Sequence, residues 1–256
     1  THARELLVYL PPDYATQPEA RFPVVYLHDG QNVFDAATSF SGVEWGADEA
    51  VEVLSRAGCL PPCIVVGVAN TPARIDEYTP HADAPRGGGD GAAYLELLTG
   101  TIKPLVDRTY RTRPERAHTT IGGSSLGGLI SLAALTRHGD VFGGYLVLAP
   151  SLQWADYAIV EELADVAVPP GTRVWIELGR GDDAATETPT RYVAAGRRVA
   201  ERLRAAGAQV HYAEHAGDFH HERDWAARLP RALRFVVGDG GANAAAHDDG
   251  EREAQP

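Results

Sequence analysis

Apolar and polar residues along this 256-residue chain follow two alternating patterns, one typical of strands and the other of helices. Short continuous apolar runs at residues 23–27 and 64–69 suit parallel strands that are covered on both faces. Residues 5–10 instead alternate apolar and polar side chains and end at two prolines, as an edge strand does. Four more strand candidates complete the set: residues 119–122, 145–149, 174–178 and 210–213.

Helical patterns lie between these strand candidates. One of them repeats apolar residues at helical spacing, at Tyr94, Leu98, Ile102 and Leu105. Thr188 and Pro189 have the side chains preferred at the N-cap and first position of a helix, and Gly207 suits its end. A last helix is expected over residues 223–237.

This alternation predicts an α/β fold with three layers, a mostly parallel central sheet between helices on both faces. The length alone allows one domain or two small ones, but no linker or repeat divides the chain. We therefore expect one domain over residues 1–238 and a disordered acidic tail over residues 239–256. The tail holds five acidic side chains and one arginine, so it contributes −4 to the net charge of −12.

Charge and composition exclude some classes of binding partner. A net charge of −12 argues against nucleic acid and against an anionic membrane surface, and no apolar run approaches the roughly 20 residues that cross a bilayer. The first residues lack a secretory pattern, so a signal peptide either has been removed or never existed. The compartment is therefore unknown, with the cytoplasm favoured over secretion, and the oligomeric state stays open. Cys59 and Cys63 allow a local disulfide, but the favoured interpretation is two small apolar residues beside a turn.

The strongest chemical signal is Gly-x-Ser-x-Gly at residues 123–127, with Ser125 at its centre, between a strand candidate and an apolar helical segment. That context is the one a nucleophile elbow requires. The turn is so tight that side chains two residues either side of the serine would clash, and Gly123 and Gly127 remove them. Ser124 is the competing nucleophile, but only Ser125 has glycine on both sides at this spacing.

A serine nucleophile needs a base, and the base needs an orienting acid. Asp182 and Asp183 follow the strand candidate at residues 174–178, and His220 and His221 follow the one at residues 210–213. The chain order serine, acid, histidine is that of the elbow enzymes. These loops end strands on the same side of the sheet as Ser125, so we expect the three groups to meet.

Two alternatives accompany this assignment. Asp182 and Asp183 also suit a solvated turn, and the two histidines also suit a surface pair. A metal cluster of the histidine pair with His215 and Glu222 is disfavoured, because nothing else supplies matched ligands. No metal site is predicted.

The oxyanion of such a reaction needs two donors. One is expected to be the backbone N–H of Leu126, directly after the nucleophile, and the other an N–H of Gly30 or Gln31 in the loop after an early strand. Asp29 precedes these residues, and a carboxylate there is electrostatically unhelpful unless it is paired or turned away.

Several segments together resemble the putative-esterase branch of the α/β hydrolases, from about residue 6 to residue 237. They are residues 8–14 (VYLPPDY), 27–35 (LHDGQNVFD), Arg74 with 76–80 (DEYTP), 122–128 (GGSSLGG), 149–154 (APSLQW), and His220 with Trp225. That branch includes feruloyl and acetylxylan esterases, S-formylglutathione hydrolases, siderophore esterases and mycolyltransferases. The resemblance implies an α/β-hydrolase fold, with Ser125 as nucleophile, Asp182 as acid, His220 as base and Trp154 near the pocket.

The resemblance further implies a serine carboxylesterase that acts through an acyl-enzyme on a small-molecule ester, without a cofactor. Short- to medium-chain, aryl, sugar and siderophore-type esters all fit, and the His28-Asp29-Gly30 variant tilts the choice weakly toward siderophore-type esters. Acyl transfer of the mycolyltransferase type and a non-catalytic binding module are the alternatives.

A pocket for a polar substrate is expected beside the polar, irregular segment at residues 71–91. Asp29, Tyr78 and Trp154 are its candidate lining residues, with Arg74 and Glu77 supplying hydrogen bonds. The alternative is that Arg74 and Glu77 form only a structural ion pair and that Tyr78 packs in the core.

Overall fold

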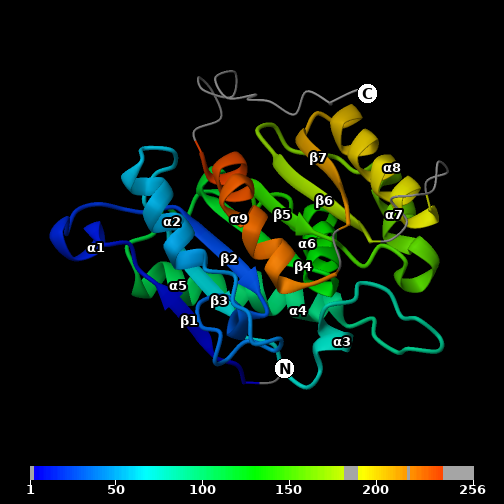
Figure 1. Cartoon of the computed structure of the whole chain (residues 1–256), viewed down its shortest axis with the longest axis horizontal. Coiled ribbons are helices and arrows are strands. Elements are labelled where there is room, and N and C mark those ends of the chain that lie inside the picture. Colours follow the sequence, from blue (N-terminus) through cyan, green and yellow to red (C-terminus); the bar gives the residue numbers. More distant parts are fainter. Residues whose placement is uncertain (1–2, 182–189, 218–219, 239–256) are drawn as a thin grey trace.

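The computed structural model describes residues 3–181, 190–217 and 220–238, and a single sheet runs through the described chain (Figure 1). Its strand order is β1-β3-β2-β4-β5-β6-β7, and β1 alone pairs antiparallel among the strands described. The strands are β1 (Leu6–Tyr9), β2 (Val24–His28), β3 (Ile64–Val68), β4 (Thr119–Ser124), β5 (Gly144–Leu148), β6 (Arg173–Gly181) and β7 (Gln209–Ala216).

Helices cover both faces of the sheet. Helices α2 (Ala47–Arg56) and α9 (Glu222–Val237) lie together on one face, which is toward the viewer in Figure 1. The opposite face is covered by α4 (Gly91–Leu97), α5 (Lys103–Thr109), α6 (Leu126–Arg137), α7 (Ala158–Glu162) and α8 (Arg191–Ala205). The short helices α1 (Asp13–Thr16) and α3 (Arg74–Glu77) lie in connecting loops. The predicted three-layer α/β fold is confirmed.

The sheet explains why its central strands are continuously apolar in sequence. Side chains of a strand point alternately to its two faces, and in β2 Val24 and Tyr26 pack in one core while Val25 and Leu27 pack in the other. Every residue of β2, β3, β4 and β5 is buried. The half-buried strand β1 lies at the edge, as its alternating pattern and following prolines predicted.

One helical prediction is wrong in its last member. Tyr94, Leu98 and Ile102 are buried, but Leu105 is 45% exposed. A π-helical turn at Leu98–Ile102 separates α4 from α5, and such a turn holds more residues than an α-helical one. The turn therefore shifts the face of α5 that meets the core, and Leu105 is rotated toward solvent.

The other predicted elements match closely where the chain is described. Thr188 and Pro189 lie outside the described residues; α8 begins at Arg191, and the Thr190 hydroxyl accepts a hydrogen bond from the Val193 N–H at 3.3 Å. Gly207 follows that helix with a φ of +97°, which glycine adopts without strain. Helix α9 begins one residue before the predicted start.

The two cysteines are free thiols. Cys63 is buried directly before β3 and Cys59 is exposed, so the interpretation as small residues beside a turn is confirmed. Burial raises the pKa of the Cys63 thiol to about 12, which leaves it protonated at neutral pH. No helix in the described part of the chain is long and apolar enough to cross a bilayer. Residues 239–256 lie outside the description, so the domain boundary and the acidic tail stay predictions.

Candidate active site

Ser125 lies in the turn between β4 and α6 with φ of 56° and ψ of −120°. A positive φ is unfavourable for a residue with a side chain and persists only where the surroundings enforce it. Here the surroundings are crowded. A Cβ atom on Gly123 would lie 2.9 Å from the carbonyl carbon of Gly127, and one on Gly122 would lie 2.3 Å from the Cβ of Leu146. This is the strand–turn–helix geometry that Gly-x-Ser-x-Gly predicts.

The Ser125 side chain points away from the core at the first turn of α6. Its Oγ lies 3.2 Å from the Oγ of Ser151, and the Ser151 N–H donates to the Ser125 carbonyl oxygen at 3.0 Å. Leu126 is the first residue of α6, and the first N–H groups of a helix have no acceptor within the helix. Ser151 was not among the predicted site residues. It lies three residues after the end of β5, at the same edge of the sheet as Ser125, and that position could have indicated it.

His220 and His221 have different surroundings. His220 is exposed and its ring lies edge-on against Trp225, with 5.0 Å between ring centroids. His221 is the N-cap of α9, and its Nδ1 accepts a hydrogen bond from the Arg223 N–H at 3.1 Å. His221 therefore caps a helix, whereas the His220 ring packs against Trp225. Asp182 and Asp183 both lie outside the described residues.

The pKa of His220 is lowered from its ordinary value. Although the residue is exposed, the protein atoms packed around part of the ring disfavour its charged form, and the Arg74 cation acts in the same direction. Glu222 opposes this shift. The imidazole is therefore largely neutral at neutral pH, which is the form that accepts a proton.

A cavity of about 410 Å³ opens beside Ser151 and His220. Tyr157, Tyr192 and Trp225 supply its aromatic surface, and Arg180 and Arg228 supply cationic groups. The two predicted aromatic residues lie elsewhere. Trp154 is buried, with its Nε1 donating to the His81 carbonyl oxygen, and Tyr78 is fully buried.

Behind this cavity, Glu177 of strand β6 forms a buried polar cluster. Its carboxylate accepts hydrogen bonds from Arg228 Nε at 2.6 Å and Trp175 Nε1 at 3.0 Å, and it lies 3.6 Å from His215 Nε2. Burial alone would raise the pKa of Glu177, but the nearby His215 ring and the hydrogen bond and charge of Arg228 outweigh it and lower the pKa. Through the bond between Arg228 and Glu177, the cluster connects α9, which begins two residues after His220, to strand β6.

No three metal-ligating side chains lie together among the residues that the structure describes, which here are 215–217 and 220–222. His215 instead contacts the carboxylate of Glu177.

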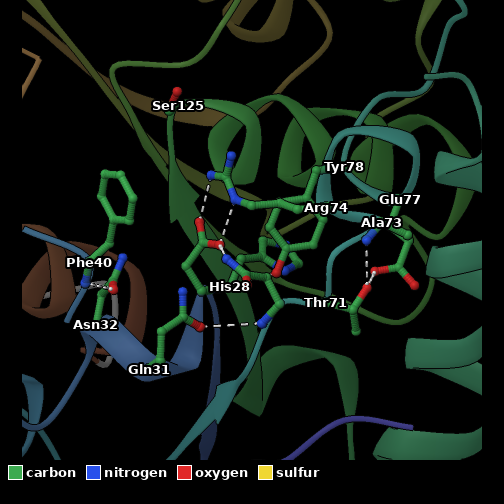
Figure 2. A network of polar contacts seen from close by, with 12 residues as sticks. His28, Gln31, Asn32, Phe40, Thr71, Ala73, Arg74, Glu77, Tyr78 and Ser125 are labelled. Carbon is green, nitrogen blue, oxygen red and sulfur yellow. Dashed lines mark hydrogen bonds and ion pairs between the residues drawn. The ribbon is translucent and has the colours of Figure 1, made fainter. Parts of the chain in front are cut away.

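On the other side of Ser125, Asp29 follows β2 with a left-handed backbone, φ 57° and ψ 49°. Its carboxylate receives two parallel hydrogen bonds from Arg74, from Nε and Nη2, both at 2.7 Å, and one from Asn70 Nδ2 at 2.6 Å (Figure 2). The Asp29 N–H donates to the Tyr78 hydroxyl at 3.2 Å. The condition set from the sequence, that Asp29 be paired, is met.

This pairing corrects the expected partner of Arg74. Glu77 pairs with Arg4 at 2.5 Å and accepts a hydrogen bond from the Thr71 hydroxyl at 2.9 Å, while Arg74 pairs with Asp29. Tyr78 packs in the core, as the alternative interpretation held. Its hydroxyl accepts the hydrogen bond from the Asp29 N–H.

The candidate second oxyanion donors follow Asp29 in the short 3₁₀ helix Gly30–Asn32. Gly30 is packed so closely on β3 that a Cβ atom there would lie 2.4 Å from the Gly67 carbonyl carbon. The Gln31 side-chain oxygen accepts a hydrogen bond from the Asn70 N–H at 3.3 Å. A Cβ atom on Gly127 would lie 3.7 Å from Asp29 Oδ2, so this loop adjoins the serine turn.

Comparison with known proteins places this arrangement in a family. The family profile described as "Putative esterase" matches residues 1–236. The chain belongs to the putative esterase family. Membership makes it an ester hydrolase, and the enzyme class expected from the sequence is confirmed at that level.

Relatives in sequence and in structure agree with the family. The chain is 27% identical to the uncharacterised Bacillus subtilis protein YbbA, over 92% of this chain and 93% of YbbA. It is 27% identical to the ferri-bacillibactin esterase BesA of Bacillus subtilis, over 54% of this chain and 50% of BesA.

Among solved structures, the BES protein of Bacillus cereus has a TM-score of 0.72 at 21% identity, over 91% of this chain and 89% of that one. The enterobactin esterase FES of Shigella flexneri has a TM-score of 0.71 at 20% identity, over 91% of this chain and 55% of that one. At these identities the structures show the shared α/β-hydrolase fold.

Proposed function

We propose that this chain is a serine carboxylesterase that works through an acyl-enzyme with Ser125 as nucleophile. The observation that carries the proposal is the strained backbone of Ser125 at the start of α6, in a chain whose family hydrolyses esters. Strain of this kind is retained where it serves chemistry. His220 is the proposed base and Asp182 its orienting acid, with Asp183 as the alternative.

In the proposed first step, Ser125 Oγ attacks the ester carbonyl carbon while His220 takes the hydroxyl proton. The carbonyl oxygen becomes an oxyanion held by the Leu126 N–H and by Gly30 or Gln31. When the tetrahedral intermediate collapses, His220 returns the proton to the departing alcohol, which leaves an acyl-serine. Water then attacks the acyl-serine with His220 again as base, and the carboxylic acid is released. These proposed steps use no cofactor or metal.

The electrostatics of the described residues support these roles. The lowered pKa of His220 keeps the imidazole neutral and ready to accept a proton. The N-terminal end of α6 favours negative charge next to Ser125, where the oxyanion forms.

The substrate is proposed to be a small ester of the short- to medium-chain, aryl, sugar or siderophore type. A cavity of about 410 Å³ lined by tyrosines and arginines suits a compact polar acyl group better than a long fatty chain. BesA and the triacetylfusarinine C esterase of Aspergillus fumigatus, which is 30% identical over 34% of this chain and 30% of its own length, bring siderophore esters into the test panel.

Fluorophosphonate labelling of the intact protein, followed by peptide mapping, tests the nucleophile. We expect one adduct, on Ser125. An unlabelled protein would favour a non-catalytic binding module, and an adduct on Ser124 would contradict the assignment.

A series of p-nitrophenyl esters, run beside feruloyl, acetyl-sugar and catecholate-siderophore esters, tests the substrate class. We expect kcat/KM to peak at or below about C8, because each buried CH₂ contributes ~0.8 kcal/mol only until the cavity is full. A maximum at C12 or longer would contradict the pocket while leaving the nucleophile assignment intact. Adding an alcohol acceptor to the same assay distinguishes acyl transfer from hydrolysis.

A further inference from the structure

We propose that the Asp29–Arg74 ion pair is a positioning device that holds the backbone of Gly30 and Gln31 in place as the second half of the oxyanion hole. The inference rests on the proposed serine mechanism and deepens it. It assigns a function to a carboxylate that would otherwise oppose catalysis at this place.

The backbone of Asp29 needs to be held. Asp29 has a φ of 57°, in the left-handed region that residues with a side chain adopt infrequently. Four contacts fix it: two hydrogen bonds from Arg74, one from Asn70, and one from its own N–H to Tyr78. Both the carboxylate and the backbone of Asp29 are therefore restrained, and Gly30 follows directly.

The pair connects two loops that meet at the same edge of the sheet. Asp29 and Gly30 follow β2, whereas Asn70 and Arg74 follow the neighbouring parallel strand β3. Gly30 is also packed on the backbone of Gly67 in β3. The direction of the Gly30 and Gln31 N–H groups therefore depends on how the loop after β3 is anchored, and the guanidinium of Arg74 provides that anchor.

The charges are arranged to suit an oxyanion. The Asp29 side chain is 5% exposed and that of Arg74 is 29% exposed, so the anion is buried and the cation lies toward the solvent side. In Figure 2 the Arg74 guanidinium lies on the side of the network nearest Ser125. A planar guanidinium matches a carboxylate in two parallel hydrogen bonds, a geometry that lysine cannot reproduce. The negative charge of Asp29 is thus neutralised on the side where the oxyanion forms.

A second ion pair on the same helix serves as a matched control. Arg4 and Glu77 form a buried pair, and Glu77 lies one turn after Arg74 on α3. The Glu77 carboxylate bonds to Arg4 and to the Thr71 hydroxyl, and among the described residues it forms no hydrogen bond or ion pair with residues 29–31. Breaking this pair removes a comparable buried interaction without touching the Asp29 turn.

The experiment compares Arg74→Gln, Arg74→Lys, Asp29→Asn and the double variant Asp29→Asn/Arg74→Gln with Glu77→Gln. We measure kcat and KM on p-nitrophenyl acetate, Tm, and the inhibition constant of a trifluoromethyl ketone, whose adduct with the serine carries an oxyanion. Loss of one oxyanion donor lowers kcat by about 10²–10³-fold. We expect Arg74→Gln and Asp29→Asn each to lower kcat by at least ~10-fold, with KM within ~3-fold, as loss of transition-state stabilisation requires.

Three further results are expected if the pair acts as a unit. The double variant loses no more activity than the worse single variant, because coupled residues are not additive. Ketone affinity falls in step with kcat. Glu77→Gln lowers Tm by a similar amount but keeps kcat within ~2-fold. Arg74→Lys keeps the positive charge but cannot form two parallel hydrogen bonds to the carboxylate, so it should give an intermediate kcat. This variant tests the proposal even if Arg74→Gln fails to fold.

The proposal is overturned if Asp29→Asn and Arg74→Lys both keep full kcat, or if Glu77→Gln loses kcat as much as they do at equal Tm loss. Failure of the proposed function gives a different pattern. In that case the wild-type protein neither hydrolyses the ester nor takes a fluorophosphonate label on Ser125, so the variants have no activity to compare.

Discussion

The two sides of the Ser125 turn are built in different ways. On the side of β2 and β3, the polar groups are buried and bonded to one another, with Asp29 3% exposed and joined to Arg74, Asn70 and Tyr78. On the side of β6 and β7, His220 is exposed and adjoins an open cavity that Arg180 and Arg228 help to line.

The difference fits the proposed mechanism, in which one side holds the oxyanion and the other supplies the base. Oxyanion donors act by being fixed before the reaction, and buried ion pairs fix backbone geometry. A base has to exchange protons with substrate and water, so it needs access. Glu177 supplies rigidity on the second side too, but from behind the cavity, through Arg228 of α9.

The largest expected effect is at the point where the two sides meet. Ser125→Ala should abolish ester turnover while leaving the fold intact, because what remains without the nucleophile is typically ~10³–10⁴-fold catalysis over water. Steady-state kinetics and circular dichroism check this. Ser124→Ala is the control: Ser124 is buried at the end of β4, so it should keep activity. Retention of more than a few per cent by Ser125→Ala, with loss in Ser124→Ala, would reverse the two roles.

The next effect separates the two histidines. His220→Ala should lower kcat by orders of magnitude, because it removes the base. His221→Ala should keep kcat but lower the free energy of unfolding by about 1 kcal/mol, because it removes the N-cap of α9. Parallel kinetics and urea unfolding give both values, and equal losses of kcat would mean that the base is misassigned.

The buried cluster behind the cavity should show mainly in stability. Glu177→Gln removes the buried anion that pairs with Arg228, and breaking a buried pair costs about 3–5 kcal/mol. Urea unfolding at pH 7 measures the loss. Glu161→Gln breaks the exposed pair with Arg198 and should change stability little. Equal losses in the two variants would show that burial of the Glu177 cluster does not matter.

A smaller effect is expected in the pH profile. Because the pKa of His220 is lowered, the base stays neutral as pH falls to its ordinary value of about 6.5, and kcat/KM should decline only below that. The Arg74 cation contributes to this lowering, so Arg74→Gln should move the acidic limb to higher pH, and Glu222→Gln should move it to lower pH. Limbs that stay in place in both variants would mean that another group controls the profile.

The smallest effect is expected from the acidic tail, which belongs to neither side. Truncation after Gly238 should leave Tm and kcat/KM near those of the full chain, because the removed residues lack apolar side chains able to pack. Gly238 is retained because its carbonyl oxygen accepts a hydrogen bond from Arg173. A drop of several degrees in Tm would show that the tail packs on the domain.

The sequence by itself determined the features that depend on neighbours along the chain. The glycines around Ser125 follow from the local crowding of one turn, and the mostly parallel sheet follows from continuous apolar runs separated by helical patterns. The placement of His220 after β7 needs only the boundaries of one strand and one helix.

Only the tertiary structure decided which side chains meet across the sheet. Arg74 lies three residues before Glu77, yet it pairs with Asp29 from another loop. Glu77 instead pairs with Arg4, which lies two residues before β1. Glu177 likewise finds Arg228 of α9, and Tyr78 and Trp154 turn into the core. These partners are set by distances between segments far apart in sequence, which the packing of helices on the sheet fixes and no local pattern records.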